Sequence, residues 1–147
     1  MPRRPRARLR DRLPRLDVLV AVGLGGMAGA SARYGLGRWL ARSPGGFPWA
    51  TFWANVAGSF LLGLALTALL ERFPPTRLAR PFLATGVLGA LTTMSTYQVE
   101  TALLVRDGHP ATAAAYGLTS LVAGIAAAFA GIVAGRGAPV RHQEVDQ

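Results

Sequence analysis

Charged residues are absent from four long stretches of the chain. These stretches run over residues 18–32, 43–70, 81–99 and 110–135. A helix needs about 20 apolar residues to cross the hydrocarbon core of a bilayer, and shorter stretches suffice where flanking polar side chains reach the interface. The pattern therefore predicts an all-α membrane protein with four transmembrane helices. The expected helices cover 18–40, 48–70, 81–105 and 110–135, with an Arg-rich tail at 1–17 and a polar tail at 136–147.

A soluble helical bundle is the alternative for so helical a pattern. It would need a polar face at helical period along every stretch, and residues 110–135 contain almost no polar side chain to form one. Residues Ala30-Ser31-Ala32 imitate a signal-peptidase site after an apolar segment. Because three further apolar stretches follow, we expect residues 18–40 to be retained as a span. The protein is expected in the cell membrane.

The net charge of +9 comes from arginine alone, and the arginines are unevenly placed. With the N-terminus in the cytoplasm, that side collects the seven arginines of residues 1–15 together with Arg72, Arg77, Arg80, Arg136 and Arg141. The other side holds Arg38, Arg42 and Arg106. Positively charged loops stay in the cytoplasm, so both termini are predicted to lie inside. The arginine-rich tail is therefore interpreted as a topology signal, and no nucleic-acid partner is expected.

Residues that usually carry enzyme chemistry are scarce. The sequence has no cysteine, and its histidines, His109 and His142, lie at polar ends of the expected spans. Glu100 is the one carboxylate inside a span, so a carboxylate pair for acid–base catalysis is missing. The chain is not expected to be an enzyme.

The first two spans carry small and polar residues at helical spacing. Gly25 and Gly29 form a small-xxx-small pair that allows close helix packing, and Arg33 near the end of that span needs an acceptor. Thr51, Asn55 and Ser59 recur every four residues and share one face of the second span. An Asn in a membrane helix either lines a polar site or forms a hydrogen bond between helices. The sequence leaves both interpretations open.

The third span is poorly suited to a continuous helix. Residues 85–97 contain six hydroxyl-bearing residues and two glycines. We expect a broken helix around residues 89–93, whose freed carbonyls could hold a cation. The alternative is an ordinary helix with its hydroxyls bonded back to the preceding turn. In the fourth span, Tyr116 and Ser120 are four residues apart and Gly124 continues the row.

Three motifs carry a resemblance to a known family. GLGGMAGASARYGLGR, NVAGSFLLG and GALTTMSTYQVE resemble the helix signatures of the small fluoride channels, the Fluc or CrcB family, with Glu100 also in place. The resemblance covers about Gly23 to Gly135. It implies a passive fluoride channel that reduces fluoride toxicity, built as an antiparallel dimer of four-helix subunits. Residues implied to be structural are Arg33, Gly25, Gly29, Gly58 and Ser59.

The resemblance also assigns site residues. A fluoride pathway is implied along Asn55, Thr51, Met94, Tyr97, Tyr116 and Ser120. A structural sodium ion is implied at main-chain oxygens of Gly89 and Thr92. The chemistry is consistent, since amide and hydroxyl groups are donors that replace the water of a tightly hydrated anion. Aromatic ring edges can face an anion, and a sodium ion offsets its charge.

The sequence departs from the family pattern in two respects. Met94 and Tyr97 stand where the family has phenylalanines, and Gly124 stands where a second hydroxyl is common. The uneven arginines favour one orientation in the membrane, whereas an antiparallel dimer of one chain needs two. We therefore expect pairing with an oppositely oriented homologue rather than with a second copy. A subunit with a degraded pore and a small proton-coupled exporter remain alternatives, although an exporter would need a membrane-buried carboxylate.

Overall fold

The computed structural model describes residues 15–71 and 77–137, which form helices and their connections without any strand. The Arg-rich tail up to residue 14, Arg72 and the C-terminal tail from residue 138 lie outside the described residues. The elements are α1 (Leu16–Trp39), α2 (Trp49–Glu71), the π-helical segment η2 (Pro81–Leu88), α3 (Gly89–Leu91), α4 (Met94–Arg106) and α5 (Pro110–Gly137).

Three of these helices are long and apolar enough to cross a membrane by themselves. They are Leu16–Trp39, Trp49–Ala68 and Pro110–Gly137, with mean hydropathies of 1.3, 1.4 and 2.0. The remaining span is divided, because η2, α3 and α4 follow one another with an interruption at Thr92 and Thr93. The prediction of an all-helical membrane fold with a broken third span is confirmed.

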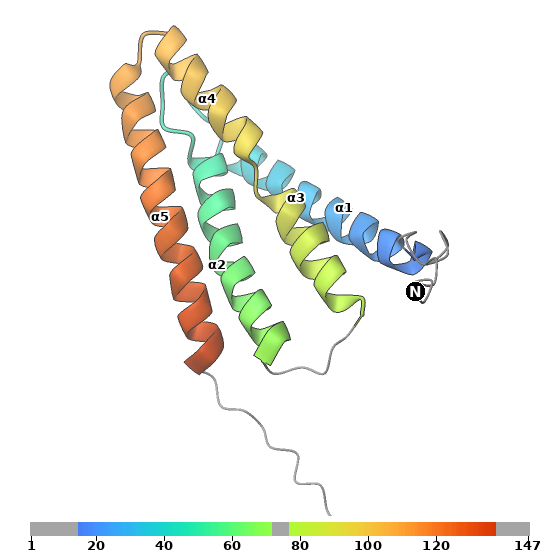
Figure 1. Cartoon of the computed structure of the whole chain (residues 1–147). Helices are drawn as coiled ribbons and strands as arrows, with labels where there is room; N and C mark the ends of the chain where they lie inside the picture. Colours follow the sequence, from blue (N-terminus) through green and yellow to red (C-terminus); the bar gives the residue numbers. More distant parts are fainter. Residues whose placement is uncertain (1–14, 72–76, 138–147) are drawn as a thin grey trace, which may run out of the picture.

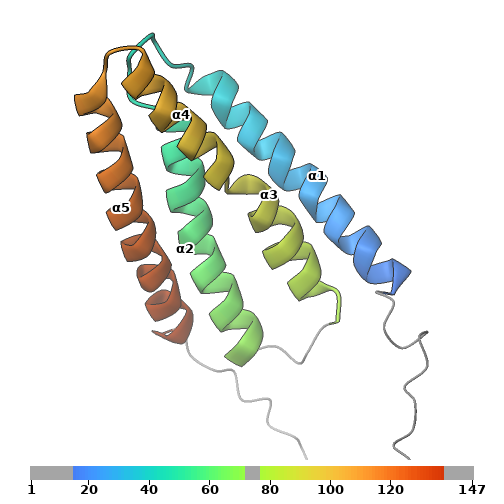
Figure 2. The ribbon, with the colours of Figure 1, turned by 45° about the horizontal axis from the view of Figure 1, so that its top comes forward.

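The third span changes its neighbour at the interruption. Before it, η2 and α3 pack mainly against α1, and after it α4 packs against α5 (Figures 1 and 2). Helix α2 packs most extensively on α5 and also contacts α1 and every part of the third span. The start of α1 and the end of α5 lie at the same end of the bundle (Figure 2). Helix α2 is therefore the element that all parts of the fold share.

Glycines set the distance between the paired helices. A Cβ built on Gly29 would lie 2.9 Å from the carbonyl carbon of Val87, and one built on Gly25 would lie 3.1 Å from the Gly86 Cα, so α1 meets η2 backbone to backbone. Helices α2 and α5 meet in the same way, because a Cβ built on Gly131 would lie 3.0 Å from the Leu64 amide nitrogen. Close backbone contact supplies the van der Waals energy that holds helices together where lipid replaces water. The expected packing role of Gly25 and Gly29 is consistent with this geometry.

The two ends of the bundle are fastened differently. At the end where α1 begins, Arg77 donates a hydrogen bond to Asp17 in an exposed ion pair. At the other end an aromatic cluster joins the α1–α2 connection to α5, with the rings of Phe47 and Tyr116 5.3 Å apart. Exposed tryptophans on and beside this cluster, Trp39, Trp49 and Trp53, suit the interface between lipid and water.

We predict that Gly29→Ala destabilises the protein and that Gly26→Ala does not. The added methyl group at position 29 would overlap the Val87 backbone, whereas nothing lies within 4 Å of a Cβ at position 26. Overpacking of this kind costs about 1–3 kcal/mol. The thermal midpoint of the purified protein in detergent measures the effect. Equal midpoints for the two variants would show that the α1–η2 contact does not limit stability.

Candidate ion pathway

The interruption of the third span consists of two extended residues. Helix α3 ends at Leu91, Thr92 has φ −78° and ψ 152°, and Thr93 has φ −151° and ψ 119° before α4 begins at Met94. The Thr92 hydroxyl still donates to the Leu88 carbonyl at 2.9 Å, as the continuous-helix alternative required. The backbone is nevertheless broken, and the break is narrower than the expected 89–93 because Gly89–Leu91 remain helical.

The side-chain amide of Asn55 pairs with the backbone of the break. Asn55 Nδ2 donates to the Thr93 carbonyl at 3.0 Å, and the Thr93 N–H donates to Asn55 Oδ1 at 2.7 Å. The amide thus takes the place that a neighbouring strand would have beside an extended residue. Of the two interpretations of Asn55, the hydrogen bond between helices is present. It uses one of the two Nδ2 hydrogens, so a second donor remains.

This pairing frees carbonyl groups at mid-span. In a continuous helix the Thr93 N–H would bond the Gly89 carbonyl, but here it bonds Asn55. Likewise the Thr96 N–H would bond the Thr92 carbonyl, but it donates to Thr93 Oγ1 at 3.2 Å as the cap of α4. The carbonyls of Gly89 and Thr92 are therefore among those that lose their helical donors where α3 ends. Main-chain oxygens of this kind are suitable ligands for an alkali cation.

A groove lies on the α5 side of the break. It has a volume of about 480 Å³ and opens at the surface, where Met94, Leu121 and Ile125 are exposed. Its polar lining includes Asn55, Ser59, Thr92, Thr93, Tyr97 and Ser120. The Oγ atom of Ser120 is buried and has no hydrogen-bond partner among the described residues. A buried hydroxyl without a partner is costly, so this donor is suited to a polar ligand in the groove.

Tyr97 and Met94 present different surfaces to this groove. The Tyr97 hydroxyl donates to the Gly117 carbonyl at 3.1 Å, which fixes the ring between α4 and α5. Its ring lies 5.2 Å from that of Tyr116. Met94 is 65% exposed, so its thioether chain is free to adapt. The groove is thus bounded by one fixed ring and one adjustable side chain.

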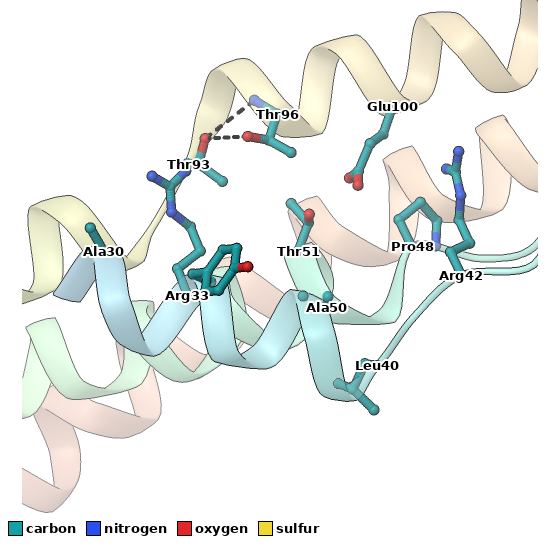
Figure 3. Close-up of a pocket in the computed structure, with 12 residues that line it drawn as sticks. Ala30, Arg33, Leu40, Arg42, Pro48, Ala50, Thr51, Thr93, Thr96 and Glu100 are labelled. Carbon is teal, nitrogen blue, oxygen red and sulfur yellow. Dashed lines mark hydrogen bonds between the residues drawn. The ribbon is translucent and has the colours of Figure 1, made fainter. Parts of the chain in front are cut away.

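A second cavity lies on the α1 side of the break (Figure 3). It has a volume of about 350 Å³. Arg33 from α1 reaches toward the break, and Glu100 from α4 points toward Thr51 on α2 (Figure 3). Tyr34, Arg42, Thr93 and Thr96 complete its polar lining. Since Thr93 also lines the groove, the break separates the two spaces by one residue.

The six predicted pathway residues are therefore not all in one place. Asn55, Met94, Tyr97 and Ser120 line the groove, and Thr51 lines the second cavity. Tyr116 is fully buried, and its hydroxyl donates to Glu100 Oε2 at 2.9 Å. It holds the carboxylate beside Thr51 instead of facing the groove.

The residues expected to be structural are placed as follows. Gly58 is buried against the Thr92 side chain, and Ser59 lines the groove, with its Oγ 3.9 Å from a Cβ built on Gly124. Arg33 lines the second cavity. Sequence reasoning missed Thr93, Thr96 and Arg42. Thr is a preferred N-cap residue, which is the signal that points to Thr93 at the start of α4, whereas nothing in the sequence places Arg42.

Comparison with known proteins identifies a family and several relatives of similar sequence. The family model described as CrcB-like protein, Camphor Resistance (CrcB), matches residues 20–132. Fluoride-specific ion channel FluC 3 of Streptomyces avermitilis is 50% identical over 133 residues, which are 90% of this chain and 65% of that protein. Fluoride-specific ion channel FluC of Thermus thermophilus is 47% identical over 111 residues, 75% of this chain and 87% of that protein.

The chain spans somewhat less than two thirds of the length of the Streptomyces avermitilis relatives, 65% of FluC 3 and 63% of FluC 2. It spans 94% of fluoride-specific ion channel FluC 1 of Mycobacterium tuberculosis, with 44% identity over 124 residues. The family match over residues 20–132 includes the glycine-lined contacts and the divided third span described above. The chain belongs to the CrcB family.

Proposed function

We propose that this protein is a subunit of a fluoride channel, which lets fluoride leave the cytoplasm passively and so reduces its toxicity. The observation that carries the proposal is the groove beside the break, where the free Asn55 N–H and the unpartnered Ser120 hydroxyl face the same space. Family membership and the names of the relatives support the same ion. The protein acts as a conduit and not as an enzyme.

The groove is chemically suited to a small anion. Fluoride holds its water tightly, so a pore must replace that water with hydrogen-bond donors. Asn55 and Ser120 are donors, and apolar side chains such as Leu62 and Ala128 keep the surroundings at low dielectric, where such bonds are strong. The positive edge of the Tyr97 ring adds a weaker attraction. The ion thus needs no cationic side chain inside the groove.

The second cavity lies toward the end of the bundle where α1 finishes, so it is suited to receiving the ion from the groove as fluoride leaves the cytoplasm. Arg33 and Arg42 give it positive charge, which raises the local concentration of anions. Glu100 accepts a hydrogen bond from Tyr116 on α5, which fixes the position of that carboxylate in the cavity lining. Thr93 borders both spaces, so the proposed outward path passes from the groove to the cavity at the break.

A sodium ion fits the freed carbonyls of Gly89 and Thr92. Both oxygens have lost their helical donors to Asn55 and Thr93, and Gly89 is exposed at the surface. Two oxygens from one chain are too few for a cation of this class, and a second subunit across the break would supply the others. The bound cation would offset the charge of the anion.

The assembly we propose is an antiparallel dimer. The groove and the Gly89 carbonyl both lie at the surface of the single chain, so a second subunit would close them. Arg15, Arg77, Arg80 and Arg136 lie at the end where α1 begins and α5 ends, and this positive charge supports a cytoplasmic location for both termini. So strong a bias favours an oppositely oriented homologue over a second copy as the partner.

We expect Ser120→Ala to slow fluoride efflux from liposomes by about 10- to 100-fold, since a lost hydrogen bond to an anion costs about 1.5–3 kcal/mol. The matched control is Thr119→Ala, whose hydroxyl is bonded to the Ala115 carbonyl at 2.6 Å and lies outside both spaces. The assay measures fluoride release with a selective electrode, with the purified protein alone and with a candidate partner. Absence of release in both settings from folded protein would contradict the channel.

A reporter fused to the C-terminus is expected to give a cytoplasmic signal only. An active periplasmic reporter at the same site in a comparable fraction of molecules would show that the chain inserts both ways. In that case a homodimer would replace the proposed pairing with a homologue. Moving arginines from the cytoplasmic to the opposite side provides the positive control, because it should redistribute the signal.

A further inference from the structure

We propose that Asn55 is a positioning residue for the cation site, in addition to lining the groove. It holds the break open by taking the Thr93 N–H that would otherwise bond the Gly89 carbonyl. The Asn55 side chain then supplies the donor to the anion and also keeps the Gly89 carbonyl oxygen free for the cation. This inference rests on the sodium ion of the proposed function.

The hydrogen-bond ladder of the third span stops where Asn55 intervenes. The Thr92 N–H still donates to the Leu88 carbonyl at 3.1 Å, in the regular helical manner. The next amide, that of Thr93, donates to Asn55 Oδ1 at 2.7 Å. The acceptor Oδ1 therefore competes directly with the Gly89 carbonyl for one hydrogen. Among the described residues of α2, Asn55 alone accepts a hydrogen bond from this amide, so removing Oδ1 removes the competitor.

Helix α2 also contacts the break through close packing against Thr92. Gly58 lies three residues beyond Asn55 on the same side of α2, and it is buried where the Thr92 methyl group rests against its backbone. Ala54, one turn before Gly58 on α2, is fully buried. The two residues of the break are therefore each fixed by α2, Thr93 through hydrogen bonds and Thr92 through contact. The position of the freed carbonyls depends on this surface.

Two variants separate the two roles of Asn55. Asn55→Asp keeps an acceptor for the Thr93 N–H, but it loses the donor and places negative charge beside the anion. Asn55→Leu has a similar size and neither donor nor acceptor, so the Thr93 N–H is free to return to the Gly89 carbonyl. Both variants are expected to lose fluoride efflux. Only Asn55→Leu is expected to lose the response to sodium.

The experiment measures the thermal midpoint of the full chain, purified with its partner if one is required, without fluoride. Sodium chloride is compared with N-methylglucamine chloride at equal ionic strength. We expect sodium to raise the midpoint of the wild type, of Asn55→Asp and of the control Thr119→Ala. The rise should vanish in Asn55→Leu. Should that variant fail to fold, Asn55→Ser serves instead, because its shorter side chain does not reach Thr93.

The outcomes are distinct from those of the efflux assay. A full sodium-dependent rise in both Asn55→Leu and Asn55→Ser would overturn the inference, and so would loss of the rise in Asn55→Asp. A wild type that conducts fluoride but shows no rise would remove the sodium site, and this inference with it, while leaving the channel intact. A wild type that shows the rise but passes no fluoride would remove the channel and leave the positioning role standing.

Discussion

Two hydrogen bonds between the Asn55 amide and the Thr93 backbone keep the third span in two pieces, and most of the site follows from that division. A polar backbone exposed at the middle of a membrane is tolerated only where protein or water satisfies it. Asn55 forms hydrogen bonds with both the N–H and the carbonyl of Thr93, so the extended conformation leaves neither group without a partner at that depth. Thr93 lines both the groove and the second cavity, and it directly follows the freed Thr92 carbonyl.

The division also explains how one span serves two neighbours. A straight helix has one axis, and it would follow either α1 or α5 along its length. Here η2 meets α1 through the close glycine contacts of Gly25 and Gly29, while α4 is held to α5 by the Tyr97 hydroxyl and by the bond from Tyr116 to Glu100. The ring and carboxylate contacts thus lie on the far side of the break from the glycine contacts. Each half of the span is anchored independently, with α2 between them.

Much of the fold could be predicted because its signals are local. The charge-free stretches identified the spans, and the hydroxyl-rich segment with its glycines indicated the break. The partner of Asn55 could not be predicted, since Thr93 is distant in sequence and its spatial neighbour depends on how α2 and the third span pack. For the same reason Tyr116 and Ser120, which share a helical face, diverge: one turn along α5 separates a hydroxyl bonded to Glu100 from one left without a partner. Spacing establishes a shared face, but only the neighbouring helix decides what each side chain meets.

A divided helix has one further property, which concerns the electrostatic potential of its backbone. Aligned peptide dipoles leave partial positive charge at the N-terminus of a helix and partial negative charge at its C-terminus. At the break the C-terminal end of α3 and the N-terminal end of α4 lie within two residues of each other. One short segment therefore presents a region that favours cations next to a region that favours anions. The backbone supplies both potentials at mid-span without burying an ionised side chain there, and the membrane penalty for fixed charge is avoided.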